Sequence, residues 1–211
     1  MIRVMLFSAL TVVSGFGQSL FAQNMLPPDV LAKSVTDEVI AILRADRDAY
    51  TANPVKVTGL IETKVLPHFN FVRMTQLAVG KNWRQANPQQ RESLIGQFRT
   101  LLVRTYATAF TTYRDETINY RPLRMRPEDD DVVVRSQIIR QGGPPVAVDY
   151  NMEKTTNGWK VYDVSIEGVS LVQNYRSTFN SEVQRSGIDG LINALGMKNR
   201  ELAEKTQGTA Q

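Results

Sequence analysis

The sequence predicts an α+β fold in which N-terminal and C-terminal helices cover a four-stranded antiparallel meander sheet. Apolar residues recur with a helical period up to about Tyr113. From Thr117 to Ile166 the period is two, and beyond Gly168 it is helical again. The links between the predicted strands are short, so neighbouring strands must run antiparallel. Helices that cover one face of such a sheet form a cone of the NTF2-like or cystatin-like kind.

Composition limits the classes of function. The chain has 211 residues and 42% hydrophobic residues, enough for one domain with a substantial core. The net charge of +4 is small and dispersed, without the clustered cations and stacking aromatics that nucleic-acid binding requires. There is no cysteine and a single histidine, His68, which excludes disulfides, thiolate sites and multi-histidine metal sites. We expect no metal and no organic cofactor.

Residues 1–22 have the features of a secretory signal peptide. Arg3 provides the positive start, an apolar run follows, and Ala22 is a small residue at the cleavage position. The apolar run is too short to span a membrane. We therefore expect an exported protein, periplasmic in a bacterium with two membranes. Residues 23–197 are predicted to form a single α+β domain. Residues 198–211 are predicted to be a polar C-terminal tail, either helical or extended, with little to bury.

Prolines and caps delimit the helices before the sheet. Pro28 opens a helix predicted over about 29–49, where a proline in the first turn costs no hydrogen bond. A short helix follows Pro54, and a third is predicted over 69–79. The longest begins at Asn87, with a proline next and Gln90 three residues after the cap. Its apolar stripe is wider than packing on one neighbour requires, which favours a ligand pocket beside it.

Four strands are predicted, at about Ile118–Met125, Val132–Arg140, Val146–Lys154 and Trp159–Ile166. One sheet face is apolar and the other is mixed, as expected when helices cover one side. In the last strand, strict alternation places Val161 and Val164 on opposite faces. After Gly168 a helix is predicted directly, with Val169, Val172, Phe179 and Val183 on one stripe.

The space between this sheet and these helices is the natural place for an apolar ligand. The predicted lining is inferred from the faces of the elements. It consists of Phe98, Leu102, Tyr106, Val134, Ile138, Val148, Tyr150, Met152, Val164, Ile166, Val169, Val172 and Phe179.

No catalytic residues are predicted. The sequence contains no G-x-S-x-G elbow, P-loop or dinucleotide-binding glycine motif. Asp163 and Glu167 are the acids closest to the apolar core. We expect a basic neighbour for Asp163, and a place near a helix N-terminus for Glu167. We expect His68 to be a hydrogen-bonded residue at the boundary of the core.

Several separated segments together resemble the MlaC family, also called the toluene-tolerance Ttg2 family. They are Ile166–Leu171 (IEGVSL), Asn174–Arg176 (NYR), Ser186–Leu191 (SGIDGL), Leu77–Arg84 (LAVGKNWR) and Phe98–Tyr106 (FRTLLVRTY). The resemblance implies a soluble periplasmic phospholipid carrier. Such a carrier shuttles glycerophospholipid between an outer-membrane lipoprotein complex and an inner-membrane ABC transporter with an MCE-domain ring, and so maintains outer-membrane lipid asymmetry.

On that reading the predicted lining holds the acyl chains. Arg135 and Arg176 are then candidates for the phosphate of the head group at the rim. We expect a monomer. Two other classes remain open from the residues alone. One is an exported adaptor whose core is filled and dry, and the other is an isomerase-like enzyme on a cone fold, with convergent polar groups in its pocket.

Overall fold

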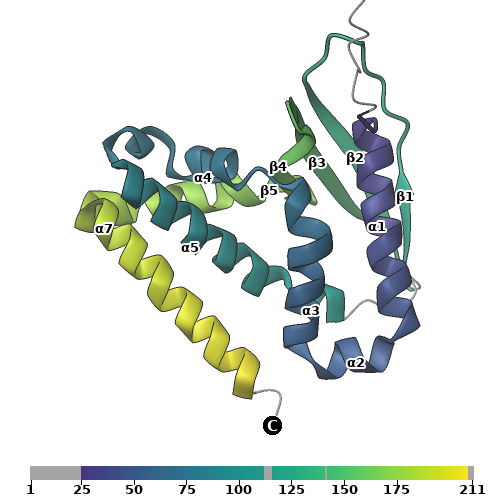
Figure 1. Cartoon of the computed structure of the whole chain (residues 1–211), viewed down its shortest axis with the longest axis horizontal. Coiled ribbons are helices and arrows are strands. Elements are labelled where there is room, and N and C mark those ends of the chain that lie inside the picture. The colour runs from purple at the N-terminus through teal and green to yellow at the C-terminus, as the bar shows by residue number, and fades with distance from the viewer. Residues whose placement is uncertain (1–24, 112–115, 141, 209–211) are drawn as a thin grey trace, which may run out of the picture.

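The computed structural model describes residues 25–111, 116–140 and 142–208. The predicted signal peptide, residues 1–22, and the predicted helix end at Tyr113 lie outside these residues. Figure 1 shows two parts side by side. In one, a curved sheet faces the helices α1, α2 and α3, and in the other α4, α5 and α7 pack on one another. Within the described residues, no helix is both long and apolar enough to cross a membrane.

The N-terminal helices are shorter and more broken than predicted. α1 covers Pro28–Ala45 and α2 covers Arg47–Ala52. Asp46, with φ −146° and ψ 52°, separates them, so the single helix expected over 29–49 is two helices. α3 (Pro54–Leu60) continues into a π-helical turn, η1 (Ile61–Val65), and a 3₁₀ turn, η2 (Leu66–His68). Asn53 caps α3 by accepting hydrogen bonds from two backbone N–H groups.

The middle helices follow the predicted caps. α4 (Phe71–Val79) leads through a 3₁₀ turn, η3 (Gly80–Gln85), to α5 (Pro88–Tyr106) and the short α6 (Thr108–Thr111). The Asn87 side chain accepts from the Gln90 N–H at 2.8 Å, and the Gln90 side chain accepts from the Asn87 N–H at 3.0 Å. This is the reciprocal capping box that the sequence predicts.

The sheet is an antiparallel meander in the order β1-β2-β3-β4-β5, which confirms the predicted fold class with five strands in place of four. The strands are β1 (Thr117–Tyr120), β2 (Asp131–Ile139), β3 (Val146–Thr155), β4 (Gly158–Ile166) and β5 (Val169–Ser170). The extra strand arises because Glu167 and Gly168 both have positive φ, 51° and 78°. Such a turn folds the chain back to pair Val169 with Ile166, where a helix start was predicted.

A β-bulge in β4 changes the faces that alternation predicts. Asn151 pairs with Asp163 and Met152 pairs with Val161, so Tyr162 is the extra residue. The inserted residue brings Val161 and Val164 to the same, inner face, although strict alternation separates them. The concave face of the sheet is therefore more apolar than predicted.

The helical part has its own core between α4, α5 and α7 (Leu171–Gly208). The Phe98 ring meets Phe179 and Tyr175 edge-on, with centroids 5.2 Å apart in each pair. The segment predicted as a polar helix or tail is helical through Gly208. Asn199 there is 4% exposed and donates to the Gln97 carbonyl at 2.9 Å. Polar anchoring by Asn199, with Leu202 packed beside the core, keeps this segment in place.

Candidate functional site

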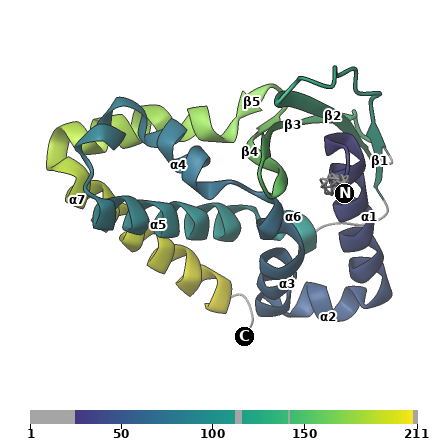
Figure 2. The same cartoon turned by 45° about the horizontal axis from the view of Figure 1, so that its top comes forward.

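An apolar cavity of about 370 Å³ lies between the concave sheet face and the helices. Figure 2 shows α1 on the concave side of the sheet, whose strands β2, β3 and β4 contribute lining residues. The volume falls at the lower end of the range of small-molecule pockets. Its lining is almost entirely aliphatic and aromatic: Leu31, Ala32, Val35, Thr36, Val39, Ile40, Ile61, Val65, Leu66, His68, Phe69, Phe71, Met74, Leu102, Val103, Tyr106, Ala109, Phe110, Ile118, Ile138, Val148, Tyr150, Met152, Val161, Val164, Ile166 and Leu171.

The sheet wall of the cavity is fixed by strand register. Tyr150 lies between Val134 on one neighbouring strand and Val164 on the other, and Val148 pairs with Ile166. Side chains on paired residues share a face. The bulge adds Val161 to this wall. The inner face of β2, β3 and β4 thus forms one continuous hydrophobic surface.

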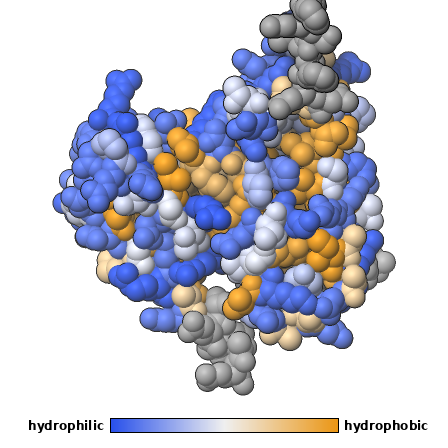
Figure 3. Space-filling model, in the orientation of Figure 1, coloured by the Kyte–Doolittle hydropathy of each residue, from blue (hydrophilic) through white to orange (hydrophobic). Residues whose placement is uncertain are grey.

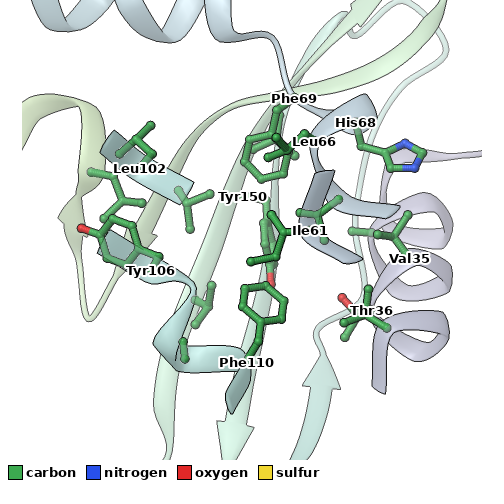
Figure 4. A pocket seen from close by; sticks show the side chains of 18 of the residues that line it. Val35, Thr36, Ile61, Leu66, His68, Phe69, Leu102, Tyr106, Phe110 and Tyr150 are labelled. Carbon is green, nitrogen blue, oxygen red and sulfur yellow. The ribbon is translucent and has the colours of Figure 1, made fainter. Parts of the chain in front are cut away.

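The opposite wall comes from α1, η1 and η2, and one side is closed by α5 and α6. Figure 4 shows Val35 and Thr36 on α1 across the cavity from Leu102 and Tyr106 on α5, with Tyr150 between them. The C-terminal half of α1 packs on α3 and η1 through Val39. Figure 3 shows apolar surface alongside α1 and α3, where the cavity approaches solvent.

The few polar groups in the wall are mostly neutral. Thr36 Oγ1 and Tyr120 Oη lie 2.7 Å apart, and Tyr120 also donates to the Ala32 carbonyl at 3.2 Å. Burial raises the pKa of Tyr120 and of Tyr150 well above the ordinary tyrosine value. Both hydroxyls therefore stay protonated at neutral pH. The Tyr120 hydroxyl ties α1 to the sheet, and neither hydroxyl places charge in the cavity.

His68 is the one lining side chain in the described part of the chain that can carry a positive charge. Burial lowers the pKa of His68, the positive charge of Lys160 lowers it further, and Glu38 opposes both effects. The imidazole is therefore mainly neutral at pH 7 without a ligand.

The structure places most of the predicted lining residues on the cavity wall and the rest elsewhere. Those on the wall are Leu102, Tyr106, Ile138, Val148, Tyr150, Met152, Val164 and Ile166. Phe98, Val172 and Phe179 instead form the core of the helical part. Val134 is fully buried in the sheet core outside the lining, and Val169, on β5, is 58% exposed. An amphipathic stripe predicts burial, but it does not tell which neighbour the stripe meets.

Neither arginine predicted at the rim lines the cavity. Arg135 has a side chain 57% exposed, and its Nε lies 3.9 Å from the Asp149 carboxylate, its cross-strand partner. Arg176 lies against Gly80, where an added Cβ would be 3.2 Å from its Nε. That contact is in the helical part, away from the sheet. Most of the lining residues that sequence reasoning missed are in α1 and in residues 61–74, whose apolar positions were recognised without being assigned to the lining. The others are Val103, Ala109, Phe110, Ile118, Val161 and Leu171.

The two acids near the core have structural roles. Asp163 accepts from the Ser170 hydroxyl at 2.5 Å and from the Val172 N–H at 3.1 Å, so it caps the start of α7. These partners replace the basic neighbour that was predicted for Asp163. The Glu167 carboxylate accepts a hydrogen bond from the Ala147 N–H across the sheet. No group of three potential metal ligands occurs within the described residues.

Fold and cavity together define a small α+β protein built around a hydrophobic site, the architecture of a binding protein for apolar ligands. The sequence profile of the MlaC protein family matches residues 33–196. The chain belongs to the MlaC family.

Individual relatives agree with this assignment. The chain is 24% identical to the intermembrane phospholipid transport system binding protein MlaC of Haemophilus influenzae over 78% of each chain. It is also 24% identical to toluene tolerance protein Ttg2D of Pseudomonas putida, over 77% of this chain and 75% of that one. A solved phospholipid-binding protein from Ralstonia solanacearum, in complex with a phospholipid, superposes with a TM-score of 0.79. It is 40% identical, covering 84% of this chain and 99% of that one.

Proposed function

We propose that this protein is a periplasmic phospholipid carrier, exported after removal of residues 1–22. The observation that carries the proposal is the hydrophobic cavity enclosed by the sheet, α1 and α5. The Ralstonia structure, 40% identical, supports it because that protein holds a phospholipid. The carrier takes glycerophospholipid between an outer-membrane lipoprotein complex and an inner-membrane ABC transporter with an MCE-domain ring, and so maintains the asymmetry of the outer membrane.

Energetics explain why such a carrier needs a closed apolar cavity. Burying one acyl CH₂ group is worth about 0.8 kcal/mol, so two long chains represent on the order of 20 kcal/mol gross. That free energy prevents a lipid from crossing water unaided. A cavity lined by side chains such as Val148, Met152 and Leu102 offsets most of it.

The same free energy makes unaided release slow. A partner complex must therefore bind an open state of the carrier more tightly than the closed state, and so shift the population toward release. The driving energy comes from the partner side, where the ABC transporter hydrolyses nucleotide.

Two alternatives make different predictions about the cavity. An adaptor with a filled core has no room for a ligand, whereas about 370 Å³ is open here. An isomerase-like enzyme needs convergent polar groups and a perturbed acid facing its pocket. The lining contains no carboxylate within the described residues, and Asp163 is occupied in capping α7. The geometry therefore favours binding over catalysis.

The deciding experiment is native mass spectrometry of the purified mature protein, followed by organic extraction and mass spectrometry of the lipids. We expect stoichiometric phospholipid, and the lipid masses give the number of acyl chains directly. A mass of lipid-free protein, unchanged after incubation with phospholipid vesicles, would contradict the proposal and favour the adaptor or the enzyme. Lipid exchange with membranes that contain the two partner complexes then tests the shuttle itself.

A further inference from the structure

The single histidine of the chain lies in the wall of the apolar cavity. His68 ends η2, and Figure 4 shows its imidazole pointing toward α1, close to Val35. The side chain is half-buried. It therefore lies where the cavity wall passes between η2 and the N-terminal half of α1.

Within the described residues, no protein group hydrogen-bonds to the imidazole of His68. A half-buried ring with unused donor and acceptor atoms differs from the hydrogen-bonded boundary histidine that the sequence predicts. A polar group left without a partner costs free energy when a ligand excludes water from it. The ring is therefore available to a polar group of the ligand.

One cation, Lys160, and one acid, Glu38, act on the charge of this ring. Lys160 on β4 donates to the Pro67 carbonyl at 2.6 Å, which holds its ammonium beside η2 with two protons unused by that bond. Glu38 on α1 is the acid that faces His68, and Lys64 on η1 pairs with it at 2.6 Å. Lys160 itself has no carboxylate partner within 4.0 Å among the described residues.

The acid opposite Lys160 is already engaged. Glu153 pairs with Lys160 in the strand register, but its carboxylate accepts from Asn70 Nδ2 at 2.7 Å and from the guanidinium of Arg73. The ammonium of Lys160 is therefore a cation without a carboxylate partner, held beside η2 where His68 lines the hydrophobic cavity. A ligand with apolar chains and one anionic group matches this distribution.

We propose that His68 and Lys160 form a phosphate subsite, which receives the phosphodiester of the bound lipid at the η2–α1 side of the cavity. The inference rests on the proposed function and adds the position of the head group. A phosphodiester cannot be left without donors beside an apolar wall. A neutral imidazole donates one hydrogen bond to it, and an imidazolium adds a charge.

In this subsite the protonation of His68 depends on whether a phospholipid is bound. Without ligand, burial and Lys160 lower the pKa of His68. A phosphodiester beside the ring stabilises the imidazolium and raises that pKa by about one unit or more. Because the chain has one histidine, its ring carbon–proton signal is unambiguous in an NMR titration of the full mature protein.

The titration is carried out on lipid-free protein, on protein loaded with phosphatidylglycerol, and on protein mixed with diacylglycerol, which lacks the phosphate. We expect a higher midpoint with phosphatidylglycerol and no rise with diacylglycerol. An unchanged or lowered midpoint with phosphatidylglycerol would overturn the subsite, and so would an equal rise with diacylglycerol. Native mass spectrometry verifies loading first, so a protein that takes up no phospholipid counts against the carrier and not against the subsite.

Variants distinguish the effect of charge at the subsite from the effect of the net charge of the protein. H68Q keeps a donor but cannot become cationic, and K160Q removes the neighbouring ammonium. We expect each to reduce the preference for phosphatidylglycerol over diacylglycerol about three- to tenfold. K154Q is the matched control, because Lys154 is exposed on the adjacent strand β3 and its loss changes the net charge equally. An unchanged preference in H68Q and K160Q, or an equal loss in K154Q, would contradict the proposal.

Discussion

Individual side chains fasten α4 to the sheet, and Arg73 makes the most contacts of this kind. Its guanidinium lies 3.7 Å from the centroid of the Tyr162 ring, 3.0 Å from the Asp131 carboxylate, and in a hydrogen bond with Glu153. Tyr162 donates to Asp131 at 2.8 Å, so the network closes on itself. The extra residue of the β-bulge thus becomes the platform on which the arginine stacks.

Replacing this arginine tests the network. We expect R73M to lower the free energy of unfolding by about 2 kcal/mol, because it leaves the part-buried Glu153 without its cation. Urea denaturation followed by circular dichroism measures the change. R126M is the control, since Arg126 is 75% exposed and pairs with acids on the surface, where loss costs about 0.5 kcal/mol or less. Equal losses in both variants would show that the Arg73 network adds no stability of its own.

Tyr162 also makes the stability of the protein depend on pH in the alkaline range. Burial, followed by the hydrogen bond to Asp131, raises the pKa of Tyr162 to about 12, from an ordinary value near 10. Its neutral form therefore stabilises the fold fully below pH 10, and this contribution is lost as the pH rises through 12. Urea unfolding at several pH values across this window should show a smaller decline in Y162F than in the wild type. If the stability of Y162F and of the wild type declined equally, the pH dependence would not come from Tyr162.

Helices and strands were predictable from the sequence where a single local signal specifies their type and position. The Asn87–Gln90 capping box and the period of two in β2 and β3 fixed the position and type of those elements. The β4 bulge was not predictable, because an inserted residue leaves the apolar content of a strand unchanged. Similarly, β5 depends on the positive φ of Glu167, an uncommon conformation for a residue other than glycine.

The bend in α7 depends on two glycines. Gly187 has φ 71°, a conformation that glycine adopts without strain, and it interrupts the helical backbone. The bend brings Ser186 so close to Gly190 that a Cβ at Gly190 would lie 2.2 Å from the Ser186 Cβ. A side chain at that position cannot be accommodated without moving the backbone.

We expect G190A to lower the free energy of unfolding by about 2 kcal/mol through this clash. Thermal and urea unfolding measure the loss. The matched control is G59A in α3, where an added Cβ has no neighbour within 4 Å. There we expect a small gain of about 0.5–1 kcal/mol, since alanine favours a helix more than glycine does. A neutral G190A would show that α7 straightens at little cost.

At the scale of the whole molecule, the cavity exists because three distant segments meet. Strand register identified the wall residues Val148, Tyr150 and Ile166 from sequence, because the faces of paired strands are coupled. No such coupling links α1 or η2 to the sheet. Leu31, Val35 and His68 were therefore not predictable as lining, although the segment of Leu31 and Val35 was recognised as helical. Phe98 and Phe179 were misplaced for the same reason, because helix periodicity gives a face and not a partner.

Filling the cavity from either wall tests whether the cavity holds the acyl chains of the phospholipid. We expect V148W on the sheet and L102W on α5 to reduce the bound phospholipid to a small fraction of the wild-type load, since each places an indole in about 370 Å³ of space. Both variants should remain folded, because the added ring occupies a volume that is otherwise open. Native mass spectrometry measures the load, and circular dichroism with thermal unfolding measures the fold.

The control for these variants places the same indole outside the cavity. Val55 on α3 is 79% exposed, so V55W should carry the full wild-type load of lipid. If V148W and L102W both fold and both keep an undiminished load, the acyl chains lie elsewhere in the molecule. If only one of the two variants loses lipid, its wall is the one in contact with the chains. The two substitutions thereby determine whether the lipid lies against the sheet, against α5, or between them.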